Sequence, residues 1–236
     1  MTDDGASMSL IEHLEELRRR LIIVVISILV AAIAGFVISR PVLNLLRAPL
    51  PDRYQTLYFT GPADAFGAQL KIAGFLGIAI AMPIILFEVW RFVTPGLTKR
   101  ERRFIWPVMV AALLLFVLGV VVGYIIIPFA FAFLLSFGGD GLQPLLTVDR
   151  YIGFVTTMLL AFGIALEFPI VLIGLAKVGI LTHRRLAAQR RWAIVIIVAL
   201  AIVVTPGGDP ISPLILSGVS LLLFEGSLLV MRLIRR

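Results

Sequence analysis

The sequence contains six apolar runs, separated by segments rich in charged residues or in glycine and proline. The runs lie at about 21–38, 69–92, 104–128, 151–178, 192–205 and 213–231. A helix of about 20 residues crosses a hydrocarbon core of about 30 Å. Of the 236 residues, 60% are hydrophobic and 15% are charged, which is more apolar surface than a soluble core of this length could bury. The sequence therefore predicts an all-α integral membrane protein with six transmembrane helices in a single domain, residues 1–236.

The first apolar run has an alternative interpretation as a cleaved signal peptide. Three arginines at 18–20 precede it, and the Ala-Ile-Ala string at 32–34 resembles a signal-peptidase site. Apolar residues nevertheless continue to Ile38, so the run is long enough to cross a membrane. We therefore expect a retained first helix.

The fifth run is short for a membrane span. Its 14 residues at 192–205 would form a helix of roughly 21 Å, against about 30 Å of hydrocarbon. Either the helix extends into the flanking loops, or the bilayer is locally thinner. The sequence leaves both alternatives open.

Lysine and arginine are unevenly distributed between the runs. Sixteen of the 21 lie in the N-terminal segment, in the segments at 91–103 and 177–191, and in the C-terminal tail. Cytoplasmic segments of membrane proteins carry such an excess. We therefore expect both termini in the cytoplasm, in agreement with an even number of spans. Because the net charge of +7 is explained by topology, we expect no nucleic-acid partner.

Three segments are then expected to face outward: 39–68, 129–150 and 206–212. In the first, Thr60, Gly61 and Pro62 precede Asp64. This pattern is typical of a helix start, because proline fits the first turn and an acid favours the positive end of the helix dipole. We also expect a short surface helix at 41–46 and a tight turn in the third segment.

Residues for common enzyme chemistries are nearly absent. The chain has no cysteine and two histidines, His13 and His183, both at predicted cytoplasmic edges. An intramembrane serine protease would lack its general base, and no H-E-x-x-H zinc motif occurs. Two Gly-Gly-Asp strings end at Asp140 and Asp209, as in some aspartyl proteases, but both lie in outward segments. With no nucleotide-binding loop either, we expect no enzymatic activity, no cofactor and no metal site.

Several acids accompany arginines at the predicted cytoplasmic side. Glu15 stands four residues before Arg19, and Glu16 stands four residues before Arg20, so each can pair along one helix. Glu101 lies inside a Lys-Arg-Glu-Arg-Arg string. Exposed pairs of this kind contribute less than about 1 kcal/mol. On pattern alone we expect local neutralisation.

Two further acids lie near the predicted cytoplasmic ends of runs. Glu88 and Trp90 are expected to be interfacial anchors. Glu225 lies seven residues before Arg232 and is expected to approach the same interface.

Glu167 differs because it lies in the middle of an apolar run, roughly 17 Å from Val178 if the run is helical. Holding an acid at that depth costs on the order of 3 kcal/mol. Pro169 cannot donate to the carbonyl of Ala165, so we expect a kink and a polar pocket there. The carboxyl could be neutral and hydrogen-bonded between helices, or could carry protons in a secondary transporter. Such transporters often have repeated halves, and the first half has no counterpart of Glu167 and Pro169.

Several motifs occur together in the order typical of one known family. They are HLEELRRRL at 13–21, GPADAF at 61–66, WRFVTPGL at 90–97, ERR at 101–103, FG at 162–163 with Glu167 and Pro169, TPGGDPIS at 205–212, and LFE at 223–225. From about Leu10 to Arg232 the chain resembles TatC, the multispanning subunit of the twin-arginine protein translocase. Asp64 stands where that family more often has glutamate, which keeps the charge.

The resemblance implies a concave six-helix bundle with structured outward loops, which binds the twin-arginine signal peptides of folded proteins at its cytoplasmic face. Glu16 and Glu101 would accept the two arginines, since a guanidinium fork pairs well with a carboxylate. The remaining surface residues implied are His13, Arg18, Pro95, Leu97 and Arg102.

The resemblance also implies partners and a location. The chain would recruit single-span subunits of the TatA and TatB types and form a homo-oligomer in the prokaryotic cytoplasmic (plasma) membrane. The proton-motive force would drive transport. Contacts with peptide and partners inside the membrane would involve Glu167, Pro169, Thr205 and Glu225. The outward loops would use Pro49, Pro62, Asp64 and Asp209.

Overall fold

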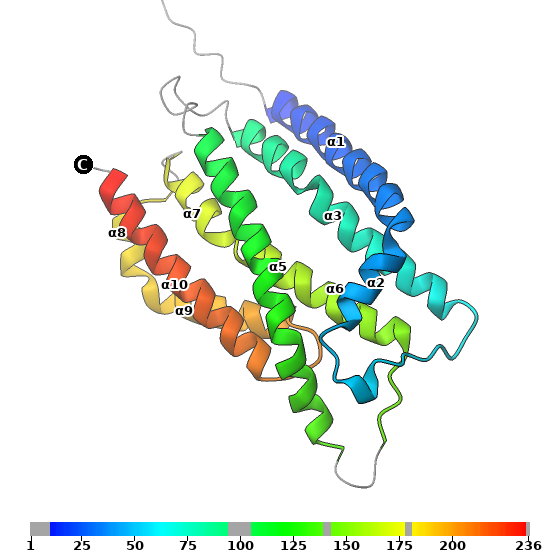
Figure 1. Ribbon diagram of the computed structural model, residues 1–236. Helices are drawn as coiled ribbons and strands as arrows, with labels where there is room; N and C mark the ends of the chain where they lie inside the picture. The colour runs from blue at the N-terminus through cyan, green and yellow to red at the C-terminus, as the bar shows by residue number, and fades with distance from the viewer. Residues whose placement is uncertain (1–9, 94–104, 139–142, 178–180, 235–236) are drawn as a thin grey trace, which may run out of the picture.

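The computed structural model describes residues 10–93, 105–138, 143–177 and 181–234 (Figure 1). Regular structure in these ranges is helical, apart from one β-bridge between Tyr58 and Thr147. Five segments in them are long and apolar enough to cross a membrane: Ile11–Val37, Asp64–Phe92, Trp106–Ser136, Val148–Ala176 and Ile211–Arg232. The prediction of an all-α protein with several membrane-spanning helices is therefore confirmed for the described ranges.

Helices α1 (Leu10–Val37) and α3 (Asp64–Val93) pack side by side along their length (Figure 1). Small residues permit this approach, because a Cβ atom on Gly77 would lie 2.8 Å from the Cβ of Ala32. Helix α1 begins well before the apolar run at 21–38, so the acids and arginines of its first turns are helical. Among them, Arg20 contacts Glu88 near the end of α3.

Helix α2 (Ser39–Arg47) is the short surface helix expected at 41–46. The last carbonyls of a helix have no partner within it, and two tyrosines supply donors here. The hydroxyl of Tyr124 donates to the Leu45 carbonyl at 2.8 Å, and that of Tyr151 donates to the Leu46 carbonyl at 2.7 Å. These two bonds attach the end of helix α2 to α5, which carries Tyr124, and to α6 (Val148–Ala165), which carries Tyr151.

Helix α5 (Ile105–Ser136) occupies the middle of the bundle and contacts α3, α6, α7 and α10 (Figure 1). The predicted third run ended at 128, whereas the helix continues through Pro128 to Ser136. The missing N–H of a proline costs less where surrounding helices satisfy the freed carbonyl. The run at 104–128 was therefore too short at the end predicted to face outward.

The fourth run forms two helices, α6 (Val148–Ala165) and α7 (Phe168–Lys177). The helix stops where Pro169 cannot donate to Ala165. Instead, the Glu167 N–H donates to the Ile164 carbonyl at 3.1 Å, and the Ile170 N–H donates to the Glu167 carbonyl at 3.0 Å. The predicted kink is confirmed, and Glu167 sits in the break.

Three helices complete the chain: α8 (His183–Ala188), α9 (Arg190–Val204) and α10 (Ile211–Ile234). Helix α9 begins at Arg190, two residues before the predicted run, and only Gln189 separates it from α8; a turn follows Val204. Its 15 residues are not among the segments long and apolar enough to cross a membrane. A sixth membrane span therefore stays a prediction. The Leu10 end of α1 and the Ile234 end of α10 lie at the same end of the bundle (Figure 1).

Candidate functional site

A cavity of about 460 Å³ opens between α1 and α3 at the end of the bundle predicted to be cytoplasmic. Its lining is mostly charged: Glu12, Glu15, Glu16, Arg19, Arg20, Ile23, Glu88 and Arg91. Four carboxylates thus face three guanidinium groups. The expected signal-docking residue Glu16 belongs to this wall.

Arg20 bridges the two helices. Its Nε donates to Oε1 of Glu16 at 3.1 Å, and its Nη2 contacts the same oxygen. Its Nη1 donates to Oε2 of Glu88 at 2.8 Å. The side chains of Arg20, Glu16 and Glu88 are only 13%, 18% and 7% exposed. The predicted Glu16–Arg20 pair is therefore confirmed, but it is not a simple surface pair.

Glu88 does not have the interfacial position that the sequence predicted for it. It is 5% exposed and ion-paired, so its assignment as an interfacial anchor was wrong. Trp90 is likewise buried, close to Gly174 of α7. One signal was available, because Glu88 is the single acid in the apolar run at 69–92.

Glu16 uses only one of its carboxylate oxygens. Both contacts from Arg20 go to Oε1, whereas Oε2 is buried and accepts no hydrogen bond from the residues that the structure describes. A buried acceptor without a donor is uncommon in native proteins and calls for an explanation. A donor from another molecule would satisfy it.

The other residues expected at this end are partly outside the described ranges. The ring of His13 stacks on that of Phe92, with centroids 4.4 Å apart, and Arg18 is exposed. The remaining expected residues lie outside what the structure describes: Pro95, Leu97, Glu101 and Arg102.

A second cavity, of about 350 Å³, surrounds the break between α6 and α7. Apolar side chains of α6, α7, α9 and α10 form most of its wall, together with Glu167 and Ser220. The Oε1 atom of Glu167 is buried and has no donor among the described residues. The polar pocket expected beside Pro169 is thus an apolar cavity with one unsatisfied carboxylate oxygen, and Pro169 itself is buried.

Two further residues expected at intramembrane contacts do not line this cavity. The hydroxyl of Thr205 donates to the Ala201 carbonyl at 2.8 Å, at the end of α9. Glu225 pairs with Arg190 at 3.0 Å, and both side chains are about half exposed. The structure therefore groups Glu167 with α9 and α10 but places Glu225 elsewhere on α10.

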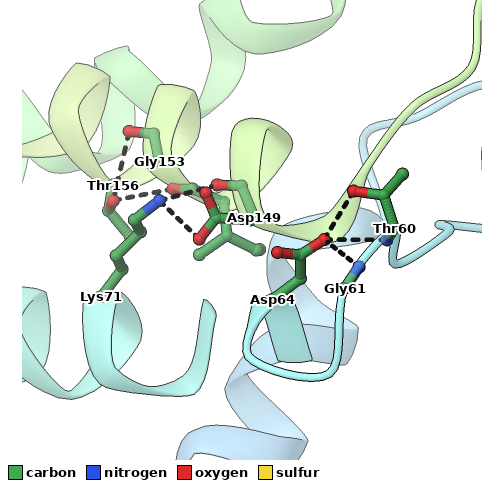
Figure 2. Close-up of polar contacts among 8 residues, drawn as sticks. Thr60, Gly61, Asp64, Lys71, Asp149, Gly153 and Thr156 are labelled. Atoms are coloured by element: carbon green, nitrogen blue, oxygen red, sulfur yellow. Dashed lines mark hydrogen bonds and ion pairs between the residues drawn. The ribbon is translucent and has the colours of Figure 1, made fainter. Parts of the chain in front are cut away.

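The loops predicted to face outward are held by polar contacts (Figure 2). Oδ2 of Asp64 accepts hydrogen bonds from the backbone and hydroxyl of Thr60, each at 2.8 Å, and from the Gly61 N–H at 3.0 Å. The predicted helix start is confirmed. Lys71 also pairs with Asp149 at 2.6 Å and joins α3 to α6.

The two longer loops are also joined directly. The Tyr58 N–H donates to the Leu146 carbonyl at 2.9 Å, and the Val148 N–H donates to the Tyr58 carbonyl at 2.7 Å. Pro49, at the end of α2, is half-buried and Pro62 is exposed. The loops predicted to face outward are thus structured in the described ranges.

The third segment predicted to face outward is the tight turn expected between the last two runs. Gly207 and Gly208 have φ values of 98° and 70°, which favour glycine. Asp209 is 3% exposed, and its Oδ1 accepts a hydrogen bond from the Ser212 N–H at 2.7 Å. Asp209 therefore caps the start of α10.

Among the described residues, no group of three or more His, Asp or Glu side chains could hold a metal.

Comparisons with known proteins agree with the motifs. A family model described as "Sec-independent protein translocase protein (TatC)" matches residues 12–218. The TatC protein of Carboxydothermus hydrogenoformans is 39% identical over 97% of this chain and 94% of its own length. That of Aquifex aeolicus is 38% identical over 97% of both chains. A crystal structure titled "Twin Arginine Translocase Receptor- TatC" is similar with a TM-score of 0.80, at 37% identity, over 95% of this chain and 100% of that one.

Proposed function

The chain belongs to the TatC family of Sec-independent protein translocase proteins, and we propose that it is the receptor and scaffold subunit of its translocase. In this role it binds the twin-arginine signal peptides of folded cargo at its cytoplasmic end and is not an enzyme. It recruits single-span subunits of the TatA and TatB types, and the proton-motive force drives export. The comparisons give no support to a proton-coupled secondary transporter.

The observation that carries the proposal is the unsatisfied oxygen of Glu16 in an acidic cavity. A guanidinium is always charged and offers several donors in one plane, so it can pair with a carboxylate that already accepts another arginine. Four acids and three arginines line the cavity, and this excess of negative charge favours a cationic peptide.

The second arginine of the signal needs a second acceptor. We propose Glu101, which follows α3 and precedes α5 in the sequence. The end of α3 and the start of α5, which flank residues 94–104 in the sequence, lie at the same end of the bundle as the start of α1 (Figure 1), and residues of that part of α1 line the cavity. His13, Arg18, Pro95, Leu97 and Arg102 would contact the peptide around the two carboxylates.

The test is binding of a labelled twin-arginine peptide to the purified chain in lipid nanodiscs. Glu16→Ala and Glu101→Ala together should weaken binding at least tenfold, as expected when charge-assisted hydrogen bonds are lost. Replacing both peptide arginines by lysine should also weaken it. Unchanged binding by the double variant would refute the docking assignment.

A different observation supports partner recruitment at the second cavity. Oε1 of Glu167 faces an apolar wall made by four helices and lacks a donor within the described residues. A partner helix that places a polar side chain there would satisfy it. We propose this site for a TatA- or TatB-type subunit, with Pro169 maintaining the helix break and with Thr205 and Glu225, outside the cavity, as further partner contacts.

We further propose a single membrane domain with six spans and both termini in the cytoplasm, in a prokaryotic cytoplasmic membrane. The shared end of α1 and α10 supports this topology (Figure 1), and so does the distribution of lysine and arginine. The loops at the opposite end, with Pro49, Pro62, Asp64 and Asp209, would then face outward. Assembly into a homo-oligomer belongs to the same proposal.

A further inference from the structure

The ion pair between Arg20 and Glu88 has a consequence beyond the docking of a signal peptide. We infer that Glu88 is a positioning residue for signal recognition, which acts through Arg20 on the carboxylate of Glu16. The inference rests on the proposed role of Glu16 as an acceptor for a signal arginine. It adds that the acceptor is prepared by a residue on another helix.

The geometry of Arg20 is the first reason. The donors of a guanidinium are fixed in one plane. Nη1 is held by Glu88 at 2.8 Å, and this bond determines where Nε and Nη2 point. Both of those nitrogens contact Oε1 of Glu16. Glu88 therefore sets the orientation of a flexible glutamate that lies on α1, and leaves Oε2 of that glutamate without a donor from the described residues.

Charge is the second reason. Within the cluster, two carboxylates face one guanidinium, and each of the three side chains is less than one-fifth exposed. An excess charge in such a place is attracted strongly to an incoming cation, because water screens it weakly. A second guanidinium can bind Oε2 without displacing Arg20. Without the charge on Glu88, Arg20 alone would neutralise Glu16 and the attraction would fall.

The fork geometry also predicts a preference for arginine over lysine. A carboxylate that is held in one orientation binds a planar donor that fits it more tightly than an ammonium. A freely rotating carboxylate binds an ammonium nearly as well. The ratio of lysine-peptide to arginine-peptide dissociation constants thus reports on the orientation of Glu16. A residue with a purely structural role would change stability but not this ratio.

The experiment compares dissociation constants of Arg-Arg and Lys-Lys peptides for the full chain in nanodiscs. Glu88→Gln keeps the shape and should weaken Arg-Arg binding about tenfold, the loss expected for one charge-assisted interaction. Lys-Lys binding should weaken less, so that selectivity falls. Glu88→Gln should have no further effect in a Glu16→Gln background. Asp149→Asn, which removes the ion pair with Lys71 at the opposite end, should leave both constants unchanged.

A second variant and a stability measurement separate the outcomes. Arg20→Lys keeps the charge but replaces the fork by one ammonium, and should also lower selectivity. If Glu16→Gln weakens binding but Glu88→Gln preserves both constants, the inference is wrong while the proposed function stands. If Glu88→Gln weakens both peptides equally and lowers the unfolding temperature, Glu88 is only structural and the inference is also wrong. If Glu16→Gln changes nothing, the docking assignment fails together with the inference.

Discussion

Two kinds of polar side chain in the described ranges differ in what they predict: some fix the ends of helices, and others leave an oxygen facing a cavity. Tyr151 donates to a terminal carbonyl of α2, and Asp209 accepts the Ser212 N–H at the start of α10. Oε1 of Glu167 lines a cavity instead and has no donor within the described ranges. Since buried polar groups normally have partners, the first kind predicts effects on stability and the second predicts effects on binding.

Asp209→Ala should destabilise the protein by about 1 kcal/mol, the usual cost of losing a helix N-cap. The Ser212 N–H would lose its acceptor in a buried turn. Thermal or denaturant unfolding in detergent would measure the change. Asp209→Asn retains an acceptor oxygen and should lie close to the wild type. Equal destabilisation by both variants would show that charge, and not the cap, matters.

Glu167→Gln and Glu167→Ala should differ in partner binding. Glutamine keeps an acceptor oxygen in the apolar cavity, whereas alanine removes it. If a partner helix donates a hydrogen bond there, alanine should weaken crosslinking to the single-span subunits several-fold, as loss of one buried hydrogen bond implies. Glutamine should retain most of it. Equal loss of crosslinking with both variants would instead show that partner binding requires the negative charge of Glu167.

The helices were predictable from hydropathy, but their partners were not. The fourth run and its break at Pro169 followed from the missing N–H of proline. The extension of α5 to Ser136 did not follow from the sequence pattern. The predicted run ends at Pro128 because proline is typical of a helix end, although apolar residues continue past it. Glu16 pairs with Arg20 by helical spacing, whereas Glu88 lies 68 residues away from Arg20. Only the packing of α1 on α3 brings that third member into the site.

The contact between α1 and α3 can be tested at two glycines of α3, one turn apart. A Cβ on Gly77 would lie 2.8 Å from Ala32 Cβ and 2.9 Å from the Ile28 carbonyl oxygen, whereas one on Gly74 would meet nothing within 4 Å. Gly77→Ala should therefore destabilise by about 1–3 kcal/mol through overpacking. Gly74→Ala should be neutral or stabilise by up to about 1 kcal/mol. Unfolding curves of the two variants provide the comparison, and equal stability would argue against the close approach.

At the scale of the whole molecule, the charge pattern and the arrangement of helix ends indicate the same topology. The start of α1, the end of α3, the start of α5 and the end of α10 lie at one end of the bundle (Figure 1), and the segments rich in arginine and lysine are next to these helix ends in the sequence. The uncertain element is α9, because its 15 residues make a helix of about 22 Å. Hydropathy alone could not decide whether α9 crosses the membrane, because this depends on both the length of the helix and the local thickness of the bilayer.

Single cysteines on the two sides of α9 decide the topology. The chain has no cysteine of its own, so each introduced thiol is unique. The exposed residues Ala188 and Pro210 flank α9, and Gln143 lies in a predicted outward loop. With six spans, a membrane-impermeant maleimide should label Pro210→Cys and Gln143→Cys in intact cells, but Ala188→Cys only after permeabilisation. If Ala188→Cys and Pro210→Cys are labelled from the same side, α9 does not cross, and five spans would put the two ends of the chain on opposite sides.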